Sequence, residues 1–169
     1  SEGLICTTAC LGSYIDQCIV DDNIEEAYNH LKELHDIFGE RLFIELQPLN
    51  DIEQIKVNLE LIKMARTFNI KLLTGTDSHY IEKEDHYIHD ILLCIGTGAK
   101  LSDEVRFRFK NEFWFMSYEE VIEQYQKQIA LIDEVPDFYM PAVYESLYST
   151  NVKTNIIYYL KPTCPRPLS

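Results

Sequence analysis

The sequence predicts an α/β fold built on a parallel sheet, and two observations lead to this prediction. Three short apolar runs, residues 3–8, 42–46 and 71–76, are each followed by a segment whose apolar residues recur at helical spacing. None of the runs alternates apolar with polar residues, so each strand is expected to be buried on both faces. This order is typical of an α/β barrel or of a doubly wound sheet, where right-handed helical crossovers join parallel strands.

The first strand, residues 3–8, stops at a turn-like segment, residues 9–13. The next predicted helix begins after one of three capping candidates, Asp21, Asp22 or Asn23. Apolar residues then recur at helical spacing as far as the stop at Gly39, and they are Ile24, Ala27, Leu31, Leu34 and Phe38.

Two further strand-and-helix pairs follow along the chain. The strand 42–46 precedes a helix expected at 52–68, with Asn69 as its end. The strand 71–76 then opens into a loop, and a helix is expected at 84–95 before the sequence Gly-Thr-Gly. In parallel α/β folds the carboxyl ends of the strands meet at one rim, which is where such folds carry their chemistry.

The character of the chain changes after residue 98. Residues 106–115 read RFRFKNEFWF, which fits either a surface that stacks bases and pairs with phosphates or a strand with one buried face. A helix is expected to begin near Ser117 in a capping box. The proline-rich last thirty residues are expected to be extended. We therefore divide the chain into residues 1–100 and a connecting segment, residues 101–169.

The composition indicates a soluble globular protein. The chain has 169 residues, of which 46% are hydrophobic, and no apolar run reaches the roughly 18 to 20 residues of a membrane span. Five irregularly spaced cysteines without a CxxC pair suggest reduced thiols, so a cytoplasmic location without a membrane partner is expected. A formal net charge of -13 works against strong binding of DNA by this chain alone.

Candidate functional residues follow the predicted strands. Asp77 and His79, in the sequence TGTDSHY, come directly after the third strand, and Cys10 follows the first. Carboxylate, imidazole and thiolate groups together suit Zn²⁺, Mn²⁺ or iron. The same residues also fit a simpler interpretation, in which Asp77 caps the next helix, His79 lies on the surface and Cys10 is an inert buried thiol. His86 and His89 lie on one face of the following helix, either beside metal ligands or on the helix surface.

Several segments, taken together and in order, resemble a known family. They are GLICTTACLG, IFGERLFIELQP, VNLELIKMA, LLTGTDSHYIEKEDHYIHDILLCIGTGAKLSDEVRFRF and MSYEEVIEQY. They are similar to the second half of the polymerase and histidinol phosphatase (PHP) domain of bacterial replicative DNA polymerase III alpha subunits. The resemblance covers about residues 2–125.

The resemblance implies part of a distorted (β/α)7 barrel that binds divalent metal, zinc or manganese, at its rim. It also implies a mainly helical connecting segment after the barrel, since residues 145–155 are similar to a helix that follows in the family. By this resemblance Asp77, His79 and Cys10 are metal ligands. Glu45 and His89 match recurring family positions and are expected to pack beside the ligands or hydrogen-bond to them. Ala9 stands where the family usually has a glycine before the cysteine, so the turn is expected to differ locally.

The resemblance also implies a function for a longer parent protein. The opening HxH motif of the family and the polymerase palm, with its Mg²⁺ ions, have no counterpart here, so the chain is expected to be an inactive fragment. The parent would be a DNA-directed DNA polymerase acting on primer-template with other replisome subunits, and its PHP domain a 3′–5′ exonuclease. A free-standing phosphoesterase and a non-catalytic scaffold remain alternatives.

Overall fold

A small parallel sheet lies at the centre of the structure, a computed structural model that describes residues 3–109 and 112–153, with the backbone alone for 148–153. Strands β1 (Cys6–Thr7), β2 (Leu42–Leu46) and β3 (Lys71–Thr74) are neighbours in the order β1-β2-β3. Both pairings are parallel, with Cys6 opposite Leu42 and Leu46 opposite Thr74. The predicted α/β class with parallel strands is confirmed, while these described residues show an open sheet and no closed barrel.

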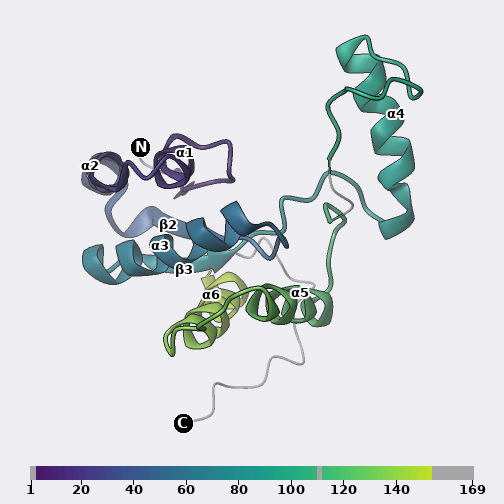
Figure 1. Cartoon of the computed structure of the whole chain (residues 1–169). Coiled ribbons are helices and arrows are strands. Elements are labelled where there is room, and N and C mark those ends of the chain that lie inside the picture. The colour runs from purple at the N-terminus through teal and green to yellow at the C-terminus, as the bar shows by residue number, and fades with distance from the viewer. Residues whose placement is uncertain (1–2, 110–111, 154–169) are drawn as a thin grey trace.

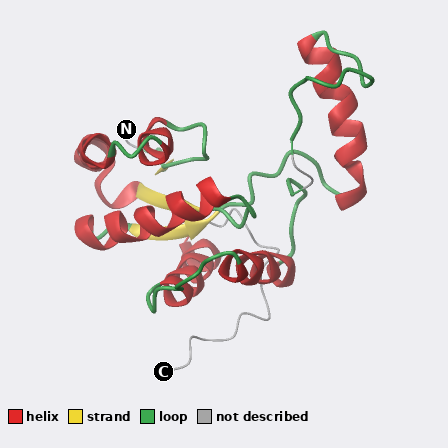
Figure 2. Ribbon diagram, in the orientation of Figure 1, coloured by secondary structure: helices red, strands yellow, loops and turns green. Residues whose placement is uncertain are grey.

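Helices surround this sheet and one of them projects away from it (Figure 1). The helices of the described residues are α1 (Tyr14–Val20), α2 (Ile24–Phe38), α3 (Ile52–Phe68), α4 (His86–Thr97), α5 (Tyr118–Ala130) and α6 (Tyr139–Lys153), with 3₁₀ turns at Gly39–Arg41 and Lys83–Asp85. Helices α1 and α2 lie on one side of the sheet, and α5 and α6 on the other. Long loops lead to and from α4 (Figure 2).

Several helix ends follow the local chemistry that the sequence predicts. Ser117 caps α5 in a reciprocal capping box with Glu120, and Asn69 ends α3 in the left-handed conformation. Asn23 occupies the cap position of α2 without a side-chain hydrogen bond. Helix α1 was not anticipated, although Ser13 caps it by accepting a hydrogen bond from the Asp16 backbone.

The expectation of an extended end is wrong for residues 139–153, which form α6, whereas the mainly helical connecting segment implied by the resemblance agrees with α5 and α6. Pro141 lies in the first turn of this helix, where a missing N–H removes no intrahelical hydrogen bond. Pro141 therefore lies where α6 begins and does not prevent the helix from forming. The remaining proline-rich segment, residues 154–169, lies outside the described residues.

One hydrophobic core joins the sheet to the helices before and after it. Its fully buried members include Ile44 and Leu72 from the strands, Leu61 from α3, and Tyr125 and Leu147 from α5 and α6. Burial of each large apolar side chain stabilises the fold by about 1.5–3 kcal/mol. Residues on both sides of position 100 belong to this core. The division of the chain into residues 1–100 and 101–169 therefore remains a prediction about the parent protein.

A buried network of amides fixes the loop that follows β2. The Gln128 side chain on α5 donates to the carbonyl oxygens of Gln47 and Leu49, at 3.0 and 2.6 Å. Asn58 on α3 donates to the same Gln47 carbonyl at 2.8 Å, and the Tyr139 hydroxyl on α6 donates to Gln128 Oε1. Three helices therefore hold one loop through hydrogen bonds that water cannot replace.

Helix α4 is apolar yet largely exposed. Among its residues only Cys94 is buried, while Ile88, Leu92 and Ile95 lie exposed at helical spacing on one face. Within the described residues, no helix is long and apolar enough to cross a membrane.

We expect Gln128→Leu to lower the free energy of unfolding by about 2–3 kcal/mol, because it removes a donor from two buried carbonyls and the acceptor from the Tyr139 hydroxyl. Chemical denaturation measures this change. Gln126→Leu, at an exposed position of the same helix, is the matched control and should change the stability by less than about 0.5 kcal/mol. Equal effects of the two substitutions would contradict the role of the network.

Candidate functional site

Asp77 and His79 lie together in the loop that follows β3. Asp77 Oδ1 and His79 Nε2 are 3.7 Å apart, and both side chains are about one third exposed. Asp77 has a positive φ of 47°, and the His79 backbone N–H donates to the Phe113 carbonyl at 2.8 Å. This hydrogen bond connects the loop with the segment that precedes α5. It therefore holds the carboxylate of Asp77 and the imidazole of His79 on the same rim.

Aromatic rings surround the His79 imidazole. The ring centroids of Phe109, Phe113 and His89 lie 4.7, 5.2 and 5.3 Å from that of His79. Burial lowers the pKa of His89, and the neighbouring His79 lowers it further, so His89 is neutral near pH 7. The sequence left two interpretations of His89, a position beside metal ligands or one on the helix surface. The structure places its ring beside that of His79. That His89 assists metal ligands remains a prediction.

Two carboxyl groups lie behind this rim, Asp16 buried and Glu45 half-buried. Burial raises the pKa of Glu45, with hydrogen bonds from Gln47 and Thr7 opposing the shift and the charge of Asp77 adding to it. Burial also raises the pKa of Asp16 to about 8, against a hydrogen bond from Ser13 and with the charge of Glu45. The Oδ1 atom of Asp16 has no hydrogen-bond partner among the described residues. Both groups therefore favour the protonated form.

Gly75 makes room for Glu45 at the end of β3. A Cβ atom on Gly75 would lie 1.9 Å from Glu45 Oε1, so any side chain there would displace the carboxyl group. Nothing in the sequence indicated Asp16, because it lies in the unpredicted helix α1 and no motif marks it. Glu45 lies where the sequence predicted it, at the end of β2.

Cys10, the third predicted ligand, is half-buried in the turn after β1, and its sulfur faces Gly12 of the same turn. Ala9 before it has a left-handed φ of 64°, the conformation that favours glycine. Within residues 3–109 and 112–153, no three His, Cys, Asp or Glu side chains are grouped so that they could hold a metal ion. Asp77 and His79 are therefore close together, and the metal role of all three residues stays a prediction.

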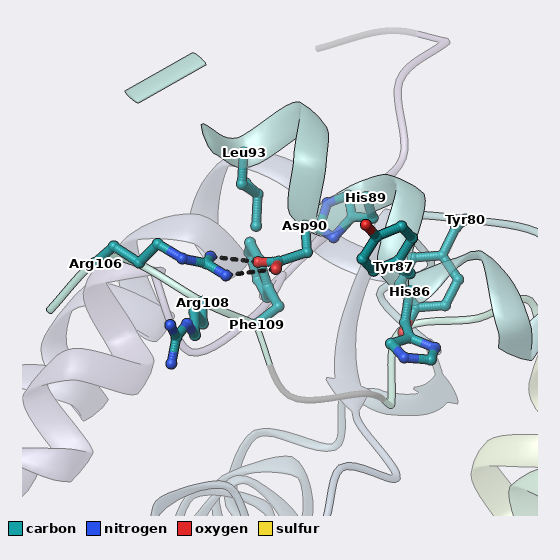
Figure 3. A pocket seen from close by; sticks show the side chains of 9 residues that line it. All are labelled: Tyr80, His86, Tyr87, His89, Asp90, Leu93, Arg106, Arg108 and Phe109. Carbon is teal, nitrogen blue, oxygen red and sulfur yellow. Dashed lines mark hydrogen bonds and ion pairs between the residues drawn. The ribbon is translucent and has the colours of Figure 1, made fainter. Parts of the chain in front are cut away.

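A pocket of about 320 Å³ lies between α4 and the loop 106–109 (Figure 3), and His89, which lines it, has its ring 5.3 Å from that of His79. Arg106 forms two hydrogen bonds with Asp90, one of them 2.6 Å long, and Arg108 lies near them. Tyr87 and His86 face these groups from the other side, with Phe109 between. Residues 106–109 do not form the strand that one interpretation of the basic and aromatic stretch required.

Comparison with known proteins shows what the chain is related to, although no protein-family model matches it. It is 43% identical over 124 residues to the DNA polymerase III subunit alpha of Borreliella burgdorferi. The identity is 39% over 122 residues for that of Thermus aquaticus and 38% over 123 residues for that of Treponema pallidum. These matches cover 73%, 72% and 72% of the chain, and 11%, 10% and 10% of the relatives.

The chain is homologous to a segment of DNA polymerase III subunit alpha. It spans only about a tenth of the length of these relatives. The comparison thus connects the chain with a replicative DNA polymerase, and it leaves the domain and the exonuclease role of this segment as proposals.

We expect Ala9→Gly to raise the free energy of unfolding by about 0.5 kcal/mol, because glycine adopts the left-handed conformation without steric cost. Ala130→Gly, at the end of α5, should lower it by about 0.5–1 kcal/mol. Denaturation of both variants tests the strain at position 9. A destabilising Ala9→Gly substitution would contradict it.

We expect Asp16→Asn to stabilise the protein more at pH 8 than at pH 5. The folded Asp16 has a pKa of about 8, above its unfolded value, so the folded state binds more protons across this range and loses stability as the pH rises. Asparagine removes this loss, by an amount on the order of 1 kcal/mol or more. Denaturation at several pH values in EDTA measures it, with Asp133→Asn, at an exposed position, as the control. A pH-independent difference would contradict the raised pKa.

Proposed function

We propose that the chain is part of a PHP domain in a DNA polymerase III alpha subunit, and that its rim is a divalent metal site for 3′–5′ phosphodiester cleavage. The observation that carries this proposal is the pairing of Asp77 with His79 directly after β3, within a segment homologous to these polymerases.

The strand order supports a barrel as the parent fold. Strands β1, β2 and β3 are neighbours in chain order, and both connections are parallel crossovers. Consecutive neighbours throughout are the rule in an α/β barrel, whereas a doubly wound sheet reverses its strand order at a switch point. We therefore interpret the open sheet as an arc of a distorted (β/α)7 barrel, with the segment after residue 100 leading towards the polymerase palm.

The donor set fits a zinc or manganese ion. Two ligand atoms that each lie about 2.1 Å from one tetrahedral ion are about 3.4 Å apart. The 3.7 Å between Asp77 Oδ1 and His79 Nε2 is close to that separation. Cys10 is the third proposed ligand, and a bound ion would supply a water of lowered pKa that attacks the phosphodiester.

The residues around these ligands have separate roles in this proposal. The rings of Phe109 and Phe113 hold the His79 imidazole in place and limit its access to water. Neutral His89 adds no positive charge that would repel a metal ion. The raised pKa values of Glu45 and Asp16 favour the uncharged forms of the two carboxyl groups behind the rim, and Asp77 is the carboxyl group that lies beside His79 to face a cation.

The whole parent protein would add deoxynucleotides to a primer, with Mg²⁺ at a palm that this chain does not include. Its partners would be primer-template DNA and other replisome subunits, in the cytoplasm. The polymerase names of the relatives support this role. The exposed apolar face of α4 supports it too, because a face of this kind is normally covered within a larger protein.

One observation favours a non-catalytic scaffold as a second candidate. The described residues bring together two donors, Asp77 and His79, and no group of three. In that case the domain would support the polymerase without binding metal tightly.

Calorimetric titration of the chain with Mn²⁺ and Zn²⁺ separates these candidates. We expect weak binding, with a dissociation constant above about 10 μM, because catalytic sites normally need three protein ligands in place. Asp77→Ala should abolish it, and Asp133→Ala, at an exposed loop position, should leave it unchanged. Binding that is identical in both variants would exclude a metal role for Asp77 and leave the scaffold.

A further inference from the structure

The α4 pocket combines aromatic faces with a cation in a strongly acidic chain. Tyr80, Tyr87 and Phe109 contribute rings to its lining, and Tyr87 is 58% exposed, so the protein core does not use its ring face. The cavity of about 320 Å³ falls at the small end of the range of ligand sites. It therefore has the size and the lining of a site for a flat ring with a polar substituent.

The two arginines of the pocket differ in their availability. Asp90 holds Arg106 through both carboxylate oxygens, and the Arg106 side chain is only 5% exposed. Arg108 is exposed and donates to the Asp103 carbonyl at 3.0 Å. Within the part of the chain that the structure describes, no carboxylate forms an ion pair with Arg108. Its guanidinium is thus oriented by a neutral carbonyl. The nearby Asp90 attracts it electrostatically, but both oxygens of Asp90 are already hydrogen-bonded to Arg106, so Arg108 can still pair with an anion.

The pocket and the proposed metal rim are continuous. His89 lines the pocket, and its ring lies 5.3 Å from that of His79. Phe109 contacts both histidines, with centroid distances of 4.7 and 5.3 Å. A ligand in the pocket would therefore extend towards Asp77 and His79 past neutral, aromatic surfaces.

We propose that this pocket binds the terminal nucleotide of a single-stranded DNA substrate, with the base stacked against Tyr87 and Phe109 and a phosphate paired with Arg108. This assignment rests on the proposed phosphodiesterase function and names its substrate site. Stacking on an aromatic ring together with an arginine–phosphate pair is a common way to bind single strands without reading their sequence. The net charge of -13 keeps the binding weak.

Heteronuclear NMR titration of the chain with the tetranucleotide dT4, at low salt and in EDTA, tests this proposal. The expected shifts concentrate on residues 86–93 and 106–109, with a dissociation constant of about 0.1–1 mM, at the weak end of non-specific binding. Arg108→Gln should weaken binding at least about 5-fold and reduce the salt slope by about 0.7. Arg66→Gln, which removes the same charge from the surface of α3, should change it less than about 2-fold.

A second pair of measurements tests the stacking. Tyr87→Leu should weaken dT4 binding at least about 5-fold, and an abasic tetranucleotide should bind to the unmodified chain equally weakly. Equal effects of Arg108→Gln and Arg66→Gln, or an absence of shifts at 2 mM dT4, on the order of the weakest affinity expected, would overturn the proposal. So would binding of tetraglutamate as tight as that of dT4, because the pocket would then be a general anion site.

The metal-free buffer separates this proposal from the proposed function. Asp77→Ala should retain dT4 binding at this pocket while it abolishes metal binding. Metal binding that survives in Asp77→Ala would therefore refute the metal rim alone, and dT4 binding that does not depend on Arg108 would refute the nucleotide site alone.

Discussion

The amide network at the end of β2 is the interaction on which the rest of the structure depends. Where the strand ends, the carbonyl groups of Gln47 and Leu49 leave the sheet but remain buried, so they need donors from elsewhere. Gln128 from α5 and Asn58 from α3 supply them, and Tyr139 from α6 completes the hydrogen bonding of Gln128. This connection aligns the helices after residue 117 with the strand ends and therefore with the rim.

The residues at the rim lower the stability of the folded protein. Asp16 is buried and Glu45 half-buried behind a surface that already carries Asp77. Burial raises the pKa of both groups, the charge of Asp77 adds to the shift of Glu45, and the charge of Glu45 adds to the shift of Asp16. Ala9 adds a left-handed residue in the turn beside them. Perturbed ionisable groups and backbone strain gather more often at functional sites than elsewhere in a protein. Their concentration at the strand ends is what a ligand-binding rim would require.

Periodicity and capping signals predicted most elements of this fold. Apolar spacing located α2 and α3, a capping box located the start of α5, and Asn69 and Ser117 marked ends that the structure confirms. Helix α1 escaped prediction because its seven residues carry too short a pattern. For α6 the prolines suggested an extended end, and only the family resemblance indicated a helix. Strand β2 has the predicted bounds. Strand β1 is shorter than expected at both ends, and β3 is shorter because Gly75 and Thr76 already belong to the loop.

The candidate site was less accessible to sequence reasoning. The proximity of Asp77 and His79 could be predicted because they are two residues apart directly after one strand. The packing of His89 and Phe109 against His79 depends on how α4 and the loop 106–109 return to β3, which no local pattern encodes. The burial of Asp16 likewise depends on elements that are distant in sequence, such as the strand that carries Glu45.

Paramagnetic broadening of backbone amide signals by Mn²⁺ tests the central claim most directly, because it locates a bound ion without requiring activity or tight binding. If the strand ends form a metal rim, substoichiometric Mn²⁺ will first broaden the amides of residues 76–80, followed by those of residues 9–11 and 45–47. Broadening that instead follows the exposed carboxylates of α2 and α5, with the signals of Asp77 and His79 unaffected, would contradict the account.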